Sequence, residues 1–142
     1  MSRYVLDANI VLAAFAGRPG APPALLLAGV HNGDLEAVAC PLLIGEVRDN
    51  LAKPYFRALL SELEAQEAVE AFSDLAVMLA DPIDVEPVLR DSEDDYLVAL
   101  ARASGSQAIV TGDKHLLDHV GLRPLAIEAR AACELIGLIE RR

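Results

Sequence analysis

Four acidic side chains stand at places where an α/β protein could gather them: Asp7, Glu46, Asp94 and Asp113. Asp7 directly follows an apolar run, and Asp113 follows a second such run after Thr111 and Gly112. Carboxylates without paired His or Cys favour hard cations, so Mg²⁺ or Mn²⁺ is expected rather than Zn²⁺. These ions can activate water against a phosphodiester, which removes the need for a side-chain nucleophile.

Each of these acids alone has an ordinary structural explanation, as a strand-end residue, a helix-surface charge, a first-turn acid or a turn residue. Their combination favours a site, because Asp7 and Asp113 occupy equivalent strand ends. Like charges gathered in this way repel one another. We therefore expect at least one carboxylate to have a raised pKa without metal, and we expect Mg²⁺ or Mn²⁺ to raise the melting temperature.

The elements that must position the acids follow from apolar periodicity. Strands are predicted at residues 3–6, 35–40, 107–110 and 124–127, with a short edge strand from Val85 to Leu89. Helices are predicted after Asn9 as cap, at 24–31, from Pro41 to 53, at 114–119 and at 128–139. The segment 56–80 is predicted to be one long helix or a hairpin of two, and a further helix runs from 94 or 95 to 104.

This alternation of strands and helices predicts an α/β domain with a central parallel sheet of four to five strands covered on both faces, a three-layer α/β/α arrangement. Ligands in such sheets bind beyond the carboxyl ends of the strands. Asp7 and Asp113 are expected there, and Glu46 and Asp94 near the starts of helices that open from the same edge. The topology can therefore bring four distant acids together.

The composition fits one compact domain over residues 1–142, with 54% hydrophobic and 24% charged residues. Apolar runs are too short to cross a membrane, and the first residues leave no room for a signal peptide, so the expected location is the cytoplasm. Cys40 and Cys133 lie in apolar segments and are expected to be small buried side chains.

The net charge of −10 argues against tight nonspecific binding to nucleic acid, which normally requires a basic surface. Bound divalent cations would reverse the local charge that a phosphate meets at the acids. The remaining acidity is suited to a basic partner protein.

Four segments of the chain carry a resemblance to a known family: residues 5–12, 40–56, 90–101 and 109–117. They include Asp7-Ala8-Asn9, Glu46, Asp94-Asp95 and Thr111-Gly112-Asp113. In this order and spacing they resemble the PIN domain family, specifically its branch of toxins from toxin-antitoxin systems, over essentially the whole chain.

The resemblance implies a PIN-like fold and a metal-dependent endoribonuclease, with Asp7, Glu46, Asp94 and Asp113 as catalytic metal ligands and Asn9 and Thr111 as polar supports. Asp95 is adjacent to Asp94 and could share its task, whereas Asp91 is expected to cap the helix or support the ligands. The resemblance also implies an RNA substrate, a homodimer and a cognate antitoxin that blocks the site.

Other classes of enzyme fit less well. A haloacid dehalogenase phosphatase would need a second Asp where Asn9 stands, and neither a glycine-rich phosphate loop nor a serine-hydrolase elbow is present. His115 and His119 lack the motif of a zinc site and are expected to be surface residues. The remaining alternative is a noncatalytic PIN-like module that binds protein or RNA.

Overall fold

The centre of the molecule is a parallel β-sheet. The structure, a computed structural model, describes residues 1–90 and 92–141. Over these residues five strands pair in the order β3-β2-β1-β4-β5, and every pairing is parallel. The strands are β1 (Arg3–Leu6), β2 (Glu36–Ala39), β3 (Val77–Met78), β4 (Ala108–Val110) and β5 (Leu125–Ile127). The predicted parallel sheet of four to five strands is confirmed.

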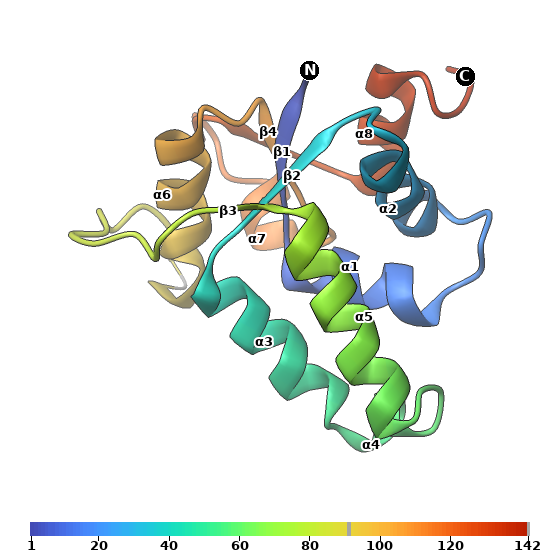
Figure 1. Ribbon diagram of the computed structural model, residues 1–142. Helices are drawn as coiled ribbons and strands as arrows, with labels where there is room; N and C mark the ends of the chain where they lie inside the picture. The colour runs from blue at the N-terminus through green and yellow to red at the C-terminus, as the bar shows by residue number, and fades with distance from the viewer. Residues whose placement is uncertain (91, 142) are drawn as a thin grey trace.

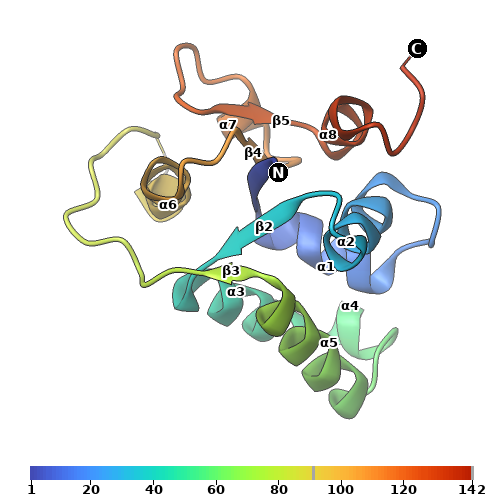
Figure 2. The same cartoon turned by 45° about the horizontal axis from the view of Figure 1, so that its top comes forward.

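Helices cover both faces of this sheet, which gives the predicted three-layer α/β/α architecture (Figures 1 and 2). One face packs against α6 (Asp95–Ser104), and the other is covered by α1 (Ala8–Ala16), α2 (Pro22–Asn32) and α8 (Ala129–Ile136). The remaining helices are α3 (Pro41–Leu51), α4 (Pro54–Arg57), α5 (Glu62–Leu75), the 3₁₀ turn η1 (Ser92–Asp94) and α7 (Lys114–Leu117).

The inner strands carry apolar side chains on both faces because both faces are covered. Val5, Val38 and Ile109 are fully buried in β1, β2 and β4. Leu97 and Leu100 of α6 are also fully buried, so the central strands and this helix share one continuous core. Both cysteines are buried and free, as the sequence predicts.

Two predictions in the middle of the chain need correction. The segment over 56–80 is neither one helix nor a simple hairpin, because α4 is a single short turn, α5 begins after Ser61 and the segment ends in β3. Ser61 and Glu64 form a complete capping box, which fixes the start of α5. The predicted edge strand from Val85 to Leu89 is wrong, since β3 occupies that edge of the sheet.

The first helix also begins differently from the prediction. Asn9 was expected as its cap, but α1 starts at Ala8 and Asp7 is the N-cap residue. The Asp7 carbonyl accepts hydrogen bonds from the amides of Ile10 and Val11, which sets the helix start directly after β1. Strand and helix therefore meet at Asp7 without a loop. No helix in the described part of the chain is long and apolar enough to span a membrane.

Candidate functional site

The order of the strands places a natural crevice beside Asp7. From β1 the chain passes to β2 on one side, while β4 pairs with the other side of β1. Such a switch in direction opens a gap beyond the carboxyl ends of the two central strands, where ligands of α/β proteins bind. Asp7 follows β1 and Thr111 follows β4, so the two residues meet at this gap.

A hydroxyl group connects the acids that follow these two strands. The Thr111 Oγ1 donates a hydrogen bond of 2.7 Å to Oδ2 of Asp7 and accepts one of 3.0 Å from the Asp113 amide. Thr111 is fully buried, and only 5% of Asp7 is exposed. Asp113 is the N-cap of α7, where its carboxylate accepts a hydrogen bond from the His115 amide. The hydroxyl of Thr111 therefore links the carboxylate of Asp7 to the backbone of Asp113.

Burial raises the pKa of Asp7 above its ordinary value. Hydrogen bonds from Thr111 and from the Ala8 amide lower that pKa in part, and the charge of Asp113 raises it. The prediction of an acid with a raised pKa is confirmed, but desolvation rather than repulsion is the larger cause. A divalent cation would relieve both costs.

The second pair of acids lies in a cavity of about 580 Å³ between α3 and the start of α6. Glu46 and Asp94 both line it, together with Glu93 and Tyr96. Burial raises the pKa of Glu46, interaction with the Tyr96 hydroxyl lowers it, and the charges of Asp7 and Glu93 raise it. Because Glu46 feels the charge of Asp7, this cavity and the gap beside β1 belong to one electrostatic site.

Asp94 and Asp95, which the sequence does not separate, have different surroundings. Asp94 lines the cavity with Glu46, whereas Asp95 is 4% exposed and turns toward the preceding loop. Its Oδ1 accepts hydrogen bonds from the amides of Val88 and Leu89, at 3.2 and 2.8 Å. These contacts give Asp95 a structural role and leave Asp94 as the better candidate ligand.

The same contacts explain why residues 85–89 form no strand. Asp95 occupies the Val88 and Leu89 amides, and His119 Nε2 donates a hydrogen bond of 3.0 Å to the Val88 carbonyl. Two amides and one carbonyl of this segment are thus bound to side chains rather than to a neighbouring strand. His119 is half-buried in this contact, so the prediction of a simple surface histidine is wrong for it, while His115 is exposed as expected.

The structure places the remaining predicted residues less favourably. Asn9 is exposed in the first turn of α1, and within the described residues its side chain makes no hydrogen bond, so no contact supports its predicted role. Asp91 lies outside the described residues. Sequence reasoning missed Tyr96 and Glu93, since neither residue type nor spacing distinguishes them from ordinary residues of a helix start.

The donor set suits a hard divalent cation, because every candidate ligand is a carboxylate oxygen. In the described part of the chain, however, no three His, Cys, Asp or Glu side chains are already arranged to hold a metal ion. The acids form two linked pairs instead, Asp7 with Asp113 and Glu46 with Asp94. One metal ion with ligands from both pairs would need side-chain movements that bring the pairs together.

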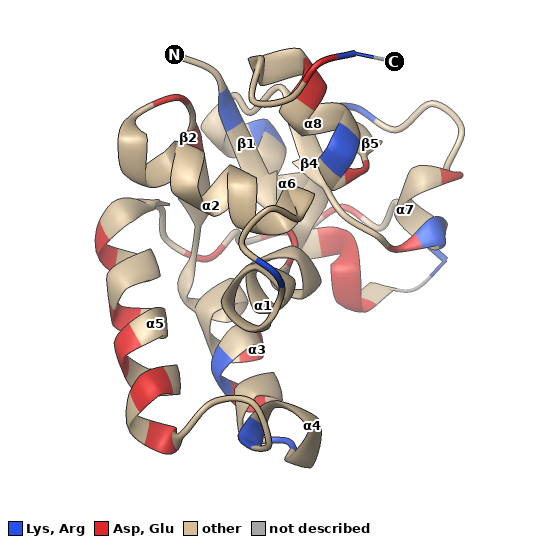
Figure 3. Ribbon diagram, turned by 90° about the vertical axis from the view of Figure 1, so that its right-hand side faces the viewer, with Lys and Arg blue, Asp and Glu red and all other residues tan. Residues whose placement is uncertain are grey.

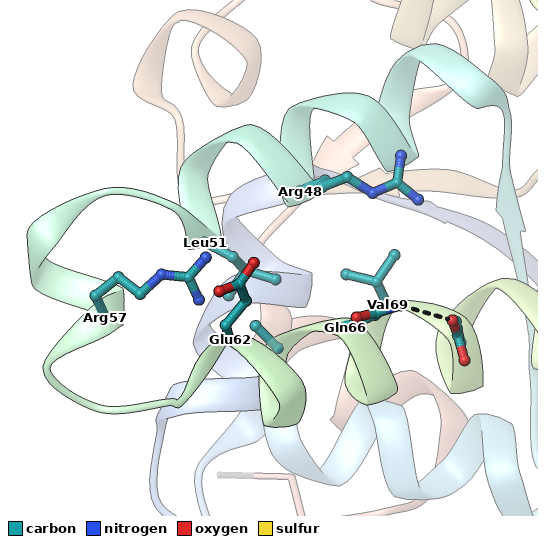
Figure 4. Close-up of a pocket in the computed structure, with 8 residues that line it drawn as sticks. Arg48, Leu51, Arg57, Glu62, Gln66 and Val69 are labelled. Carbon is teal, nitrogen blue, oxygen red and sulfur yellow. Dashed lines mark hydrogen bonds between the residues drawn. The ribbon is translucent and has the colours of Figure 1, made fainter.

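Charge is unevenly distributed around the site (Figure 3). Acidic residues follow α5 and the turn before α6, whereas basic residues lie on α3, near α4 and at the start of α7, and also on α8 and β1. A separate cavity of about 330 Å³ lies between α3 and α5 and is lined by Arg48, Arg57, Glu62 and Glu70 (Figure 4). It holds charges of both signs and none of the four candidate ligands.

Comparisons with known proteins identify the architecture. A family model described as "PIN domain" matches residues 3–115. PAE2754 from Pyrobaculum aerophilum aligns with a TM-score of 0.67 at 19% identity, over 97% of this chain and 91% of that chain. FitAcB from Neisseria gonorrhoeae aligns with a TM-score of 0.59 at 15% identity, over 89% of this chain and 98% of that chain. No curated protein sequence matches significantly.

Proposed function

Because this chain belongs to the PIN domain family, whose members are generally nucleases, we propose that it is a metal-dependent endoribonuclease. Asp7, Glu46, Asp94 and Asp113 are the proposed ligands of Mg²⁺ or Mn²⁺, and single-stranded RNA is the proposed substrate. The reaction is hydrolysis of a phosphodiester by water.

The observation that carries this proposal is the Asp7–Thr111–Asp113 network at the gap between β1 and β4. A buried carboxylate with a raised pKa is costly in the absence of a cation. A neutral side chain at the end of β1 would avoid this cost of desolvation. The network is therefore best explained by a positively charged ligand.

The proposed ions would polarise the phosphodiester and lower the pKa of the attacking water, so that hydrolysis needs no side-chain nucleophile. The residues of the chain hold the geometry. Thr111 fixes the orientation of Asp7, and the N-terminal turn of α7 fixes that of Asp113. Asp95 anchors the loop before α6, which sets the position of Asp94.

Phosphate groups next to the cleaved bond need cationic contacts, and two exposed residues flank the acids. Lys114 directly follows Asp113, and Arg90 precedes η1. Within the described residues neither forms an ion pair, so both are available to phosphate oxygens. We assign them to substrate binding.

The test incubates a fluorescent single-stranded RNA with purified protein and Mg²⁺ or Mn²⁺. We expect cleavage with either metal, none with EDTA, and a large loss in Asp7→Asn. Asp34→Asn is the matched control, because Asp34 is exposed at the turn between α2 and β2. If no metal supports cleavage, or if Asp7→Asn cleaves as fast as the control, the proposed activity is wrong and a noncatalytic binding module becomes the better description.

We further propose that the protein is the toxin of a toxin-antitoxin pair, acts in the cytoplasm and forms a homodimer. The four toxin-like sequence motifs support this, and the likeness in fold to FitAcB is in keeping with it. The net charge of −10 suits a basic antitoxin segment. Co-purification with a small protein encoded beside it tests the pair, and light scattering tests the dimer. Failure to co-purify any such protein would contradict the pair, and a monomer in light scattering would contradict the homodimer.

A further inference from the structure

Tyr96 is a buried polar residue in the wall of the acidic cavity. It lies in the first turn of α6, is 7% exposed, and lines the same cavity as Glu46 and Asp94. Among the described residues its hydroxyl completes no hydrogen bond of good geometry. Leaving a buried hydroxyl without a full partner is unfavourable, and native structures contain few such groups.

The group that faces this hydroxyl is the carboxylate of Glu46, whose pKa the tyrosine lowers by interacting with its charged form. A tyrosine hydroxyl carries its proton at neutral pH, so Tyr96 can act as a donor to this carboxylate. A phenylalanine would fill the same space without the cost of a buried hydroxyl. The hydroxyl is therefore best explained by a role toward Glu46.

The inner acid of the site already shows the corresponding arrangement. Oδ2 of Asp7 accepts a hydrogen bond from the buried hydroxyl of Thr111. Carboxylates that bind metal ions are generally held by a hydrogen bond of this kind. Glu46 and Tyr96 supply the same pair of groups from α3 and α6.

We propose that Tyr96 is a positioning residue, whose hydroxyl donates a hydrogen bond to Glu46 and holds that carboxylate in the orientation that binds the metal ion. This inference rests on the proposed function. Glu46 would be one of the residues that hold the cation, and the hydrogen bond from Tyr96 would keep its carboxylate oriented for that role.

The test compares Mn²⁺ binding by wild type and Tyr96→Phe in the absence of RNA, with isothermal titration calorimetry. We expect the dissociation constant of Tyr96→Phe to rise about 10-fold, in the range found when partners of metal ligands are removed. Tyr4→Phe is the matched control, because Tyr4 is also buried but lines a different cavity that contains none of the four acids. Its dissociation constant should equal that of wild type.

Two further measurements separate positioning from a structural role. The melting temperature of metal-free Tyr96→Phe should equal or exceed that of wild type, because a poorly partnered hydroxyl has been removed. In RNA cleavage, Tyr96→Phe should need more Mn²⁺ for half-maximal rate and regain most of the rate at saturating Mn²⁺.

Three results would overturn the inference. A Tyr96→Phe dissociation constant within twofold of wild type would show that the hydroxyl does not act on the ligand. A joint fall in metal-free melting temperature and Mn²⁺ affinity would show a structural role. A wild-type protein that binds no Mn²⁺ would reject the proposed metal site and this inference together, whereas the first two results leave the proposed function intact.

Discussion

The Thr111 hydroxyl joins Asp7 to a segment 104 residues further along the chain. It is the donor to the Asp7 carboxylate and the acceptor for the Asp113 amide, so it sets the relative positions of two proposed ligands. At the scale of single residues, the site therefore depends on a neutral side chain as much as on its acids.

Replacing Thr111 by Val keeps the shape of the side chain but removes this hydroxyl. We expect Mn²⁺ affinity to fall about 10- to 100-fold, as for other partners of metal ligands. Stability should fall by about 1–3 kcal/mol at neutral pH, because the buried Asp7 carboxylate loses a hydrogen bond. Calorimetry and urea unfolding measure the two effects. Thr111→Ser should recover most of both, and a Ser variant no better than Val would contradict the role of the hydroxyl.

The raised pKa values of Asp7 and Glu46 predict how stability changes with pH. In metal-free protein these groups keep their protons to a higher pH when folded than when unfolded. Their contribution therefore makes the folded state less stable as pH rises from the ordinary carboxyl pKa values, 3.8 and 4.5, toward the raised ones. Below the ordinary values, both states are protonated and the effect vanishes.

Urea unfolding in EDTA from pH 4 to pH 7 measures this effect. We expect Asp7→Asn to gain free energy of unfolding relative to wild type as pH rises, because asparagine carries no charge to desolvate. Asp34→Asn should follow wild type throughout. If the difference between Asp7→Asn and wild type does not change with pH, the raised pKa of Asp7 is wrong.

Some site residues were predictable from the sequence for a physical reason. Asp7 and Asp113 follow strands that must end at one edge of a parallel sheet, so the sequence places both at that edge, and the pairing of β1 with β4 makes them neighbours. The sequence could not decide which of Asp94 and Asp95 faces the cavity, because adjacent residues at a helix start differ only in the direction of their side chains. Tyr96 was not predictable either, since an aromatic residue at this position is equally suited to the core.

At the scale of elements, the loop over residues 81–90 determines where α6 begins. Asp95 and His119 hold its backbone from two sides, and Arg102 on α6 forms an ion pair with Glu86. The exposed ion pair adds little, so the anchoring depends on the buried contacts of Asp95. A loop fixed in this way keeps Asp94 at the mouth of the cavity.

Truncating Asp94 and Asp95 in turn separates the two functions. Asp95→Ala should lower the free energy of unfolding by about 1–3 kcal/mol, because the Val88 and Leu89 amides lose their acceptor. Asp94→Ala should lose Mn²⁺ affinity with a smaller loss of stability. Urea unfolding and calorimetry on both variants check this. The assignment of the ligand is reversed if Asp95→Ala is the variant that loses metal while keeping its stability.

The elements themselves were predicted well where burial and periodicity agree. The buried strand β1 was predicted with its observed bounds, and the helix starts at Pro41 and near Asp95 follow from local signals. The region around 56–89 failed because two signals were misread. Ser61 and Glu64 mark a helix start inside the supposed long helix, and the consecutive apolar residues at Val77 and Met78 fit an edge strand better than a helix.

At the scale of the whole molecule, a chain with a net charge of −10 should hold RNA through few phosphate contacts. Each phosphate contact on a single strand contributes about 0.7 to the slope of log affinity against log salt. With Arg90 and Lys114 as the contacts, we expect a slope of about −1.4.

Fluorescence anisotropy of labelled RNA measures this slope, with Asp7→Asn as the inactive background in EDTA. Adding Lys114→Ala should reduce its size by about 0.7. Arg123→Ala is the control, because Arg123 lies before the amino end of β5, whereas Lys114 lies beyond the carboxyl end of β4. A slope that changes with Arg123 but not with Lys114 would place the RNA on another face.

The most direct test of the account is Mn²⁺ binding by calorimetry to wild type, to the four variants Asp7→Asn, Glu46→Gln, Asp94→Asn and Asp113→Asn, and to Asp34→Asn. We predict that wild type and Asp34→Asn bind Mn²⁺ equally well. Each of the four variants should lose at least about 10-fold in Mn²⁺ affinity, because removing even a hydrogen-bond partner of a metal ligand costs that much. Equal Mn²⁺ affinity in all six proteins would show that these four acids do not form one metal site.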